Sequence, residues 1–358
     1  MATKRLRMSK VETHEPLNNP VLGSSNRLGI SELDLFSTIP QQDDIQKVIY
    51  ETFWPQTGSL LDTNPKCVFV THPSEYFTDL SDSYFRLEVQ LTKTPDPAKK
   101  DDTAVIGAED LANVANLAAF SLWKDLTLYI AGRKVTTNYG YYYYESYLKI
   151  LTQCTEEAKK KWCVAGFYSE RSAELLMPKD ANADAGTKAR YERFGLGNKQ
   201  VLYMPIMSNL CSQMRYIPSL CEIKIELTKG PKEWSVIQPK ANKAVYRLHL
   251  SDIQLCLKRP ILYPLRMRGI EQRLSSSSNC NYYINNSYLR PFQIDKGTVS
   301  TRIPNLLLTS YLPSFCYIAF IQSSDLDGDY NSTNFNFELF GLTELYLQVV
   351  SKNYFILV

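Results

Sequence analysis

The chain has 358 residues, of which 44% are hydrophobic and 22% charged, and its 40 Lys and Arg nearly balance its 37 Asp and Glu, for a net charge of +3. This composition excludes a disordered tail and a polycation, and the length allows two or three ordinary domains whose cores need no disulfide or metal. Aromatic residues are abundant, with 24 Tyr and 15 Phe beside only 15 Gly and 18 Pro. Because aromatic side chains favour pleated, half-buried surfaces, the composition favours β structure.

The N-terminal region, residues 1–32, is polar and lacks periodicity, so we expect a flexible basic and polar arm. No apolar run follows its basic residues, and we therefore expect no secretory signal. The composition favours a solvated arm; weak contact with nucleic acid and a weak import signal at Lys4, Arg5 and Arg7 are the alternatives. The longest apolar runs, residues 315–321 and 354–358, fall far short of the roughly 20 residues that cross a bilayer, so no membrane partner is expected.

Short strand-like segments begin at residue 44. They lie at residues 44–54, 66–71, 84–92 and 122–135, the last with a turn at Gly132. Residues 84–92 alternate, with apolar side chains at the odd positions from 85 to 91 and polar ones between them. A strand with one buried and one solvent-exposed face is typical of an antiparallel sheet. Residues 94–110, rich in Pro, Lys and Asp, indicate an insertion with turn character.

The middle of the chain interrupts the strand pattern. Tyr147, Leu148, Leu151 and Cys154 recur at helical spacing, and charged residues follow them, which predicts one short helix near residues 144–162. The irregular polar stretch at residues 177–200 is interpreted as a long loop.

Strand-like segments then resume in two groups. They lie at residues 199–207 and 221–228 and, after a polar connection at 229–243, at residues 244–258, 315–321 and 342–350. Two successive blocks of short strands indicate two β-sandwiches in tandem. The sequence therefore predicts a mainly β chain with domains at residues 33–240 and 241–358.

Residues suited to catalysis or metal binding are sparse. The three His, at positions 14, 72 and 249, include no closely spaced pair of the kind that a metal-binding jelly roll needs. Residues 325–331 superficially resemble a calcium loop, but the required Gly and Glu positions do not match. Residues 195–199 lack the remaining glycines of a phosphate-binding loop, and no nucleophile elbow occurs. We expect no catalytic, cofactor-binding or metal-binding residues, and no cofactor.

Eight Cys are scattered without a Cys-x-x-Cys pair, and we interpret them as reduced and mostly buried. The glycosylation sequons at Asn285 and Asn331 carry little meaning without a secretory signal.

The run of tyrosines at residues 139–145 allows two interpretations. A row of Tyr rings can stack bases or sugars. Consecutive tyrosines that lead into a helix more often lock that helix onto a sheet, and we favour this structural role.

Several segments, each weak alone, share their order and spacing with one protein family. They lie at residues 33–36, 75–87, 120–132, 141–151, 303–306, 312–320 and 331–347. They include a strand that ends in a Gly132 turn before a Tyr-rich helix entry, and the Asn-Phe-Asn-Phe of residues 334–337. Over residues 33–350 the chain thus resembles the hexon-like major capsid proteins of Polinton (Maverick) elements and adintoviruses, in the adenovirus-type double jelly-roll lineage.

The resemblance implies a structural protein with two eight-stranded jelly rolls side by side. Three copies form a pseudo-hexagonal capsomer, and capsomers tile an icosahedral shell around double-stranded DNA. The implied partners are further copies of the chain, a penton-like minor capsid protein and, through the arm, packaged DNA. The implied location is the virion capsid, with assembly in the nucleus or cytoplasm of a host cell. The family has no catalytic residues, so we predict no enzymatic activity.

One departure from the family concerns length. Members continue well beyond the strand that here ends near Val350, so we expect the second jelly roll to be incomplete, with an open apolar edge. A β-sandwich module that binds carbohydrate or peptide through residues 141–144 is the alternative hypothesis. An enzyme ranks third, because paired His, a nucleophile motif and a phosphate loop are missing.

Overall fold

A computed structural model describes residues 44–56, 64–94, 104–107, 110–136, 140–170, 178–238, 245–276, 279–282, 284, 287–304, 315–349 and 352–356. The predicted arm and the family segment at residues 33–36 lie outside the described residues. No helix within these described ranges is long and apolar enough to span a bilayer.

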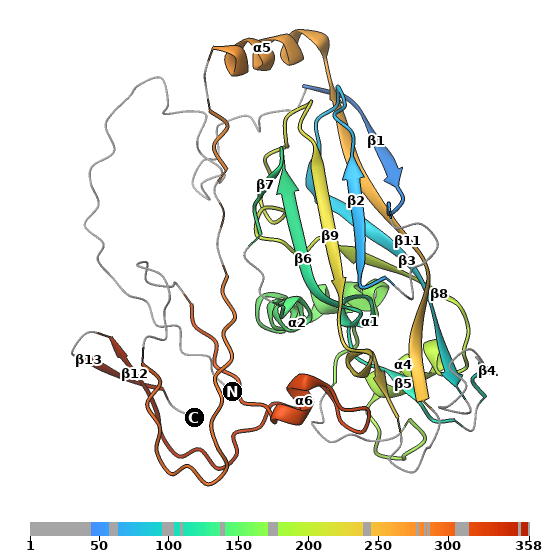
Figure 1. The fold of residues 1–358 in the computed structure, drawn as a ribbon, viewed down its shortest axis with the longest axis vertical. Coiled ribbons are helices and arrows are strands. Elements are labelled where there is room, and N and C mark those ends of the chain that lie inside the picture. Colours follow the sequence, from blue (N-terminus) through green and yellow to red (C-terminus); the bar gives the residue numbers. More distant parts are fainter. Residues whose placement is uncertain are drawn as a thin grey trace. The chain divides into compact units, whose positions relative to one another are not determined.

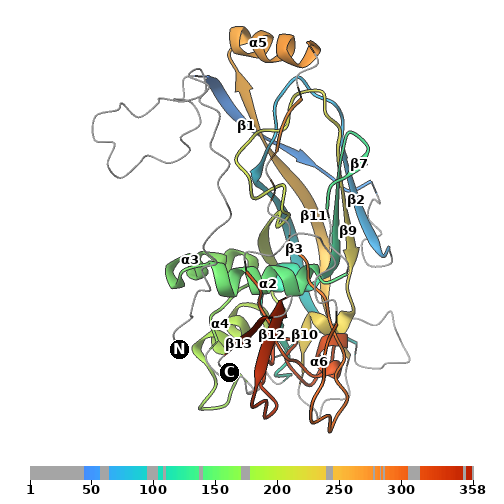
Figure 2. The same cartoon turned by 90° about the vertical axis from the view of Figure 1, so that its left-hand side faces the viewer.

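Two antiparallel sheets face each other (Figures 1 and 2). The five-stranded sheet contains β1 (Ile45–Phe53), β3 (Asp79–Thr94), β4 (Ala104–Val105), β8 (Gln200–Pro205) and β11 (Val245–Leu262). The four-stranded sheet contains β2 (Lys66–Thr71), β6 (Trp123–Ile130), β7 (Arg133–Lys134) and β9 (Ile223–Lys229). Aromatic contacts join the two layers, since the rings of Phe69 and Phe85 lie 5.3 Å apart.

The strand order is that of a jelly roll. Numbered one to eight along the chain, strands β1, β2, β3, β6, β7, β8, β9 and β11 lie in the order 1-8-3-6 in one sheet and 2-7-4-5 in the other. The first and last strands pair, and every connection except the β6–β7 hairpin passes from one sheet to the other. That hairpin turns through Ala131 and Gly132, both with positive φ, as the predicted Gly turn requires. The prediction of a mainly β chain built on a jelly roll is confirmed.

The alternation of apolar and polar residues along the strands determines which side chains form the core of this sandwich. On β3 the side chains of Phe85, Leu87, Val89 and Leu91 are buried between the sheets, whereas the residues between them are partly exposed. Each buried apolar side chain of this size contributes roughly 1.5–3 kcal/mol to the folded state. The predicted two-faced strand is therefore confirmed.

Strand β11 corrects the predicted organisation. The sequence assigned residues 244–258 to a second sandwich, but β11 pairs with β1 from Phe53↔Leu255 to Ile45↔Leu262 and with β3 along its other edge. The predicted division at residues 240 and 241 thus separates β11 from the sheet that it completes. An alternating pattern shows that a strand has one buried face, but it does not show which strand is its neighbour.

Six helices occur among the described residues. They are α1 (Ala118–Ser121), α2 (Tyr142–Gln153), α3 (Glu156–Lys161), α4 (Ala185–Phe194), α5 (Pro264–Ser275) and α6 (Ser323–Asp327), with 3-10 turns η1 (Trp162–Ala165) and η2 (Lys232–Trp234). Helices α1, α2 and α4 gather at one end of the sandwich, and α5 extends beyond the other (Figures 1 and 2).

The helical predictions are partly correct. The single helix expected near residues 144–162 is divided into α2 and α3, because Thr155 interrupts the helix and caps α3 through a hydrogen bond from the Ala158 N–H at 3.3 Å. The polar stretch at residues 177–200 is not a continuous loop, since α4 lies within it. Two further short strands, β5 (Asn113–Val114) and β10 (Val236–Ile237), pair beside this helical end.

Beyond β11 the described residues form α5, α6 and a hairpin of β12 (Leu345–Val349) and β13 (Lys352–Ile356). Strand β12 agrees with the strand predicted at residues 342–350, whereas residues 315–321, also predicted as a strand, have no regular structure. The jelly roll that the structure describes thus ends with β11.

None of the eight cysteines forms a disulfide. Cys67, Cys211 and Cys256 are buried, Cys154 and Cys221 are half-buried, and the other three are exposed. The expectation that most of them are buried is therefore wrong.

Candidate assembly surfaces

The residues that the sequence singled out for chemistry are dispersed. His72 is exposed after β2, and His249 lies on β11 among partly exposed side chains; His14 is outside the described residues. Within the described ranges, no group of three or more His, Cys, Asp or Glu is placed to hold a metal ion.

The acidic loop at residues 325–331 uses its oxygens internally. The Asp325 carboxylate is buried and accepts a hydrogen bond from the Ser332 hydroxyl at 2.5 Å. The Asp329 carboxylate accepts one from the Asn331 N–H at 2.9 Å. These bonds fold the segment on itself, and its first three residues are the last three of α6.

The tyrosines of α2 point into the protein. Tyr142, Tyr143 and Tyr144 are buried. The Tyr142 hydroxyl accepts a hydrogen bond from the Met207 N–H at 3.2 Å, and the Tyr143 hydroxyl donates one to the Asn116 carbonyl at 2.6 Å. Because protein covers these rings, they lock α2 in place and offer no platform for stacking a base or sugar.

An aromatic cluster joins α2 to a segment far along the chain, residues 320–338, which we call the docked segment. Its members are Tyr143, Tyr144, Tyr147, Trp234 and Phe335. The rings of Tyr147 and Phe335 stack with centroids 3.5 Å apart, and Tyr144 meets Trp234 edge-on at 5.6 Å. Such pairs contribute about 0.5–1.5 kcal/mol each beyond the area that they bury.

Hydrogen bonds fix the register of the docked segment. The Tyr144 hydroxyl donates to the Asp325 carbonyl at 3.0 Å, and the Trp234 indole N–H donates to the Leu326 carbonyl at 3.1 Å. In the opposite direction, the Asn334 amide donates to the Trp234 carbonyl at 2.7 Å. A hydrophobic contact tolerates slippage, but these directional bonds specify one arrangement.

Gly328 is expected to be important for the contact between the docked segment and the jelly roll. Its φ of +105° is unfavourable for other residues, and an added Cβ would lie 2.9 Å from both Glu233 Cβ and Trp234 Cδ1. We expect Gly328→Ala to weaken docking by about 1–3 kcal/mol, seen as faster limited proteolysis within residues 320–338. The control is Gly269→Ala, because its methyl group meets open space in α5. Equal cleavage rates in the two variants would contradict the expectation.

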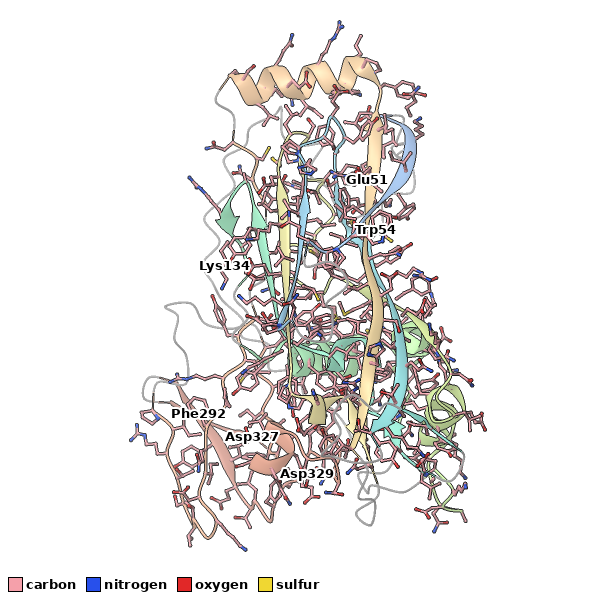
Figure 3. All side chains as sticks on the ribbon, turned by 45° about the vertical axis from the view of Figure 1, so that its right-hand side comes forward. Glu51, Trp54, Lys134, Phe292, Asp327 and Asp329 are labelled. Carbon is pink, nitrogen blue, oxygen red and sulfur yellow. The ribbon has the colours of Figure 1, made fainter. Side chains whose placement is uncertain are left out.

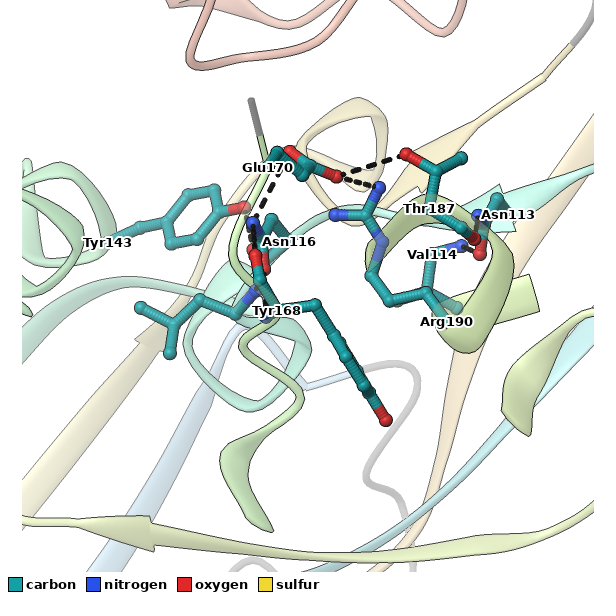
Figure 4. Close-up of polar contacts among 9 residues, drawn as sticks. Asn113, Val114, Asn116, Tyr143, Tyr168, Glu170, Thr187 and Arg190 are labelled. Atoms are coloured by element: carbon teal, nitrogen blue, oxygen red, sulfur yellow. Dashed lines mark hydrogen bonds and ion pairs between the residues drawn. The ribbon is translucent and has the colours of Figure 1, made fainter. Parts of the chain in front are cut away.

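A buried polar network organises the helical end of the sandwich (Figure 4). The Asn116 amide N–H group donates to the Tyr168 carbonyl at 2.7 Å and to the Glu170 carboxylate at 3.3 Å. The Asn116 oxygen accepts from the backbone N–H groups of Leu117 and Tyr168, both at 2.9 Å. Four bonds saturate this buried amide, so it holds two backbone segments together.

Arg190 carries the charge of the network. Its side chain is only 3% exposed and forms an ion pair with Glu170, which also accepts a hydrogen bond from Thr187 at 3.4 Å (Figure 4). Among the described residues, the Arg190 Nε and Nη1 atoms have no hydrogen-bond partner. Glu170 is therefore the group that offsets this buried charge.

The buried phenols predict that the protein loses stability in alkali. Burial raises the pKa of Tyr282 and of Tyr330 to about 12, and it also raises the pKa of Tyr142, Tyr143 and Tyr144. Tyrosines of the unfolded chain lose their protons near pH 10. Above about pH 10 the unfolded state thus binds fewer protons than the folded state, so stability is full below that pH and falls as the pH rises toward 12.

Urea unfolding at pH 9 and pH 11, with absorbance titration of the phenols, measures this effect. We expect a lower unfolding midpoint at pH 11 and a group of phenols that titrates only on unfolding. Titration of all 24 Tyr near pH 10 in the native protein would contradict it.

The outer surface of the five-stranded sheet carries an aromatic face, which we define as Val48, Tyr50, Trp54, Tyr84 and Tyr203. The Tyr84 ring lies between Tyr50 and Tyr203, at centroid distances of 6.2 Å and 5.7 Å. Trp54, which follows β1 (Figure 3), is 63% exposed and Tyr50 is 56% exposed. A group of large aromatic side chains exposed on one side of a sheet is typical of an interaction surface.

Charges beside the aromatic face are paired. Arg86 lies 3.5 Å from Asp252, and Lys199 lies 3.4 Å from Glu88. Exposed pairs of this kind add little stability. They do balance the local charge, so the face presents neutral, apolar area.

The sequence carries a partial signal of this face. Val48, Tyr50 and Trp54 occupy alternate positions of the first predicted strand and thus share one side of it. Tyr84 and Tyr203 also sit on strands, but only the pairing of β3 with β8 brings their rings together.

Comparisons with known proteins give distant likenesses. No protein-family model matches the chain. An uncharacterized protein of Caenorhabditis elegans is 21% identical over 257 residues, which are 72% of this chain and 57% of that protein. Among solved structures, the Sputnik virophage matches at 13% identity with a TM-score of 0.43, over 74% of this chain and 55% of that one. The mavirus major capsid protein matches at 12% identity with a TM-score of 0.38, over 74% of this chain and 54% of that one. The chain spans little more than half the length of these relatives.

Proposed function

We propose that this chain is a structural subunit of the icosahedral capsid of a double-stranded DNA virus or virus-like mobile element, of the hexon-like type of Polintons and adintoviruses. The observation that carries the proposal is an eight-stranded jelly roll whose five-stranded sheet presents the exposed aromatic face. A rigid sandwich with an apolar, charge-balanced face is suited to repeated contact between identical copies. The sequence resemblance to the capsid family supports the same role.

The proposed subunit acts by association and without catalysis. It forms a homotrimeric capsomer, and capsomers contact one another and a penton-like minor capsid protein in the virion, after assembly in the nucleus or cytoplasm. Residues that follow β11 contribute to a second jelly roll, and the basic arm at residues 1–32 makes weak contact with packaged DNA. The near-neutral net charge of +3 limits repulsion between crowded copies.

Sedimentation velocity of the purified chain over a range of concentrations tests the proposal. We expect a species of three times the chain mass of 41.0 kDa at high concentration. Because the aromatic face is apolar, added salt should not dissociate this species. A strictly monomeric protein at the highest concentration reached would contradict the proposed function.

A further inference from the structure

Four polar side chains from three separate parts of the chain meet beside α2. Glu145 and Lys149 lie on α2, Asn209 follows β8, and Ser287 follows α5. The Lys149 Nζ lies 2.8 Å from the Glu145 carboxylate and donates a hydrogen bond to the side-chain oxygen of Asn209 at 3.3 Å. The Ser287 hydroxyl contacts the same two groups, because it hydrogen-bonds the Glu145 carboxylate and lies 3.1 Å from the Asn209 oxygen. An amine thus lies against a carboxamide, with a carboxylate and a hydroxyl beside both.

The backbone on both sides of this group is held in place. The Tyr142 hydroxyl on α2 accepts a hydrogen bond from the Met207 N–H at 3.2 Å, which ties the helix to the chain just before Asn209. Asn209 itself lies between two buried residues, Ser208 and Leu210. The glutamate and lysine of α2 are four residues apart and therefore share one face of the helix. Groups held in contact in this way react far faster than the same groups free in solution.

Protein shields the group from much of the solvent. The side chains of Lys149 and Glu145 are 19% and 13% exposed, and Asn209 and Ser287 are half-buried. Exclusion of water strengthens the electrostatic interactions among such groups and limits competing hydrolysis of the amide.

We propose that Lys149 and Asn209 form an intramolecular isopeptide bond. Glu145 accepts a proton from the Lys149 ammonium group, and the neutral Nζ attacks Cγ of Asn209. The Ser287 hydroxyl donates to the Asn209 oxygen, which carries negative charge in the tetrahedral intermediate. When the intermediate collapses, the bond between Cγ and Nδ2 breaks. The leaving nitrogen takes one proton from Glu145 and one from the attacking nitrogen, so an ammonium ion departs and Glu145 is a carboxylate again.

The bond joins α2 to the chain after β8, across a sequence separation of 60 residues. A cross-link between distant residues stabilises a protein mainly by removing freedom from the unfolded chain. The reaction requires no cofactor, oxidant or second protein, because the four side chains supply every group that takes part. The inference goes beyond the proposed capsid function and does not rest on it.

Peptide mass spectrometry of the full chain, incubated after purification and digested with trypsin, tests the proposal. We expect a linked species that contains Lys149 and Asn209, survives reducing agents and has the summed mass of its two peptides less one ammonia. Trypsin should not cleave after Lys149 in this species. Lys149→Arg and Asn209→Ala should each lack it, and their melting temperatures should be several degrees lower.

Further variants test the assigned roles. Glu145→Gln should lack the linked species because it removes the proton acceptor, and Ser287→Ala should slow its formation by at least about tenfold. The matched control is Lys159→Arg, because Lys159 forms a similar ion pair with Glu156 on α3 at 2.8 Å. This control should form the linked species at the rate of the unaltered chain.

Two outcomes would overturn the proposal. One is complete tryptic cleavage after Lys149 in the unaltered chain after long incubation. The other is loss of ammonia through a succinimide at Asn209 that leaves the lysine unlinked. Either result is independent of the sedimentation experiment, because a monomeric chain can form this bond and a trimeric one can lack it.

Discussion

Glu170→Ala is expected to lower the free energy of unfolding by about 3 kcal/mol, the low end of the cost of breaking a buried ion pair. The substitution leaves the Arg190 guanidinium buried without its counter-ion, and two of its nitrogens already have no hydrogen-bond partner among the described residues. The low end applies because water reaches part of the Glu170 side chain, which is 21% exposed. Urea unfolding followed by tryptophan fluorescence measures the loss.

The control for Glu170→Ala also removes the positive charge of Arg190. Arg190→Met combined with Glu170→Ala should recover most of the lost stability, because an apolar side chain replaces the unpaired cation in the same space. Thr187→Val, which removes only a 3.4 Å hydrogen bond to Glu170, should cost less than about 1 kcal/mol. A double variant as unstable as Glu170→Ala alone would show that the buried charge is not the cause.

This network was beyond prediction from the sequence. Asn116, Glu170 and Arg190 are separated along the chain, and nothing in their neighbours distinguishes them from exposed polar residues. Arg190 also lies in a stretch predicted as a loop, because Ala, Gly and Lys there show no apolar periodicity. Helix α4 instead forms through the burial of Gly186, Arg190 and Phe194 at helical spacing, a pattern in which the middle member is charged.

The sandwich itself was largely predictable. Period-two alternation identified β3 and β9, and the buried faces follow it residue by residue. The pairing of strands was not predictable. The alternating residues of β11 follow a polar connection and so resemble the start of a second domain, but β11 completes the five-stranded sheet of the first jelly roll. Its eighteen residues pair with both β1 and β3, and that choice depends on contacts far apart in sequence.

The tyrosine run shows the same limit. The position of the tyrosines at the start of a helix predicted that they hold this helix in place, but the sequence did not indicate which residues they contact. Phe335 stacks on Tyr147, and these two residues lie in segments that the sequence assigned to different domains. The family resemblance included both segments without indicating that they touch.

The combined variant Tyr50→Ser, Trp54→Ser and Tyr203→Ser is expected to weaken self-association by at least about 30-fold, because a single buried aromatic anchor at an interface often contributes 2 kcal/mol or more. All three side chains are exposed in the single chain, so the urea midpoint of the monomer should hardly change. Tyr84 is left in place because its neighbours partly cover it. Sedimentation velocity over a concentration series measures the dissociation constant.

The matched control is Phe315→Ser, because Phe315 is a large aromatic residue, 71% exposed, outside the aromatic face. If loss of any exposed aromatic side chain altered association through solubility, both variants would behave alike. If the aromatic face is the contact, the triple variant dissociates and Phe315→Ser associates like the unaltered chain. An unchanged dissociation constant in the triple variant would remove the aromatic face from the assembly proposal and leave the jelly roll without an identified contact surface.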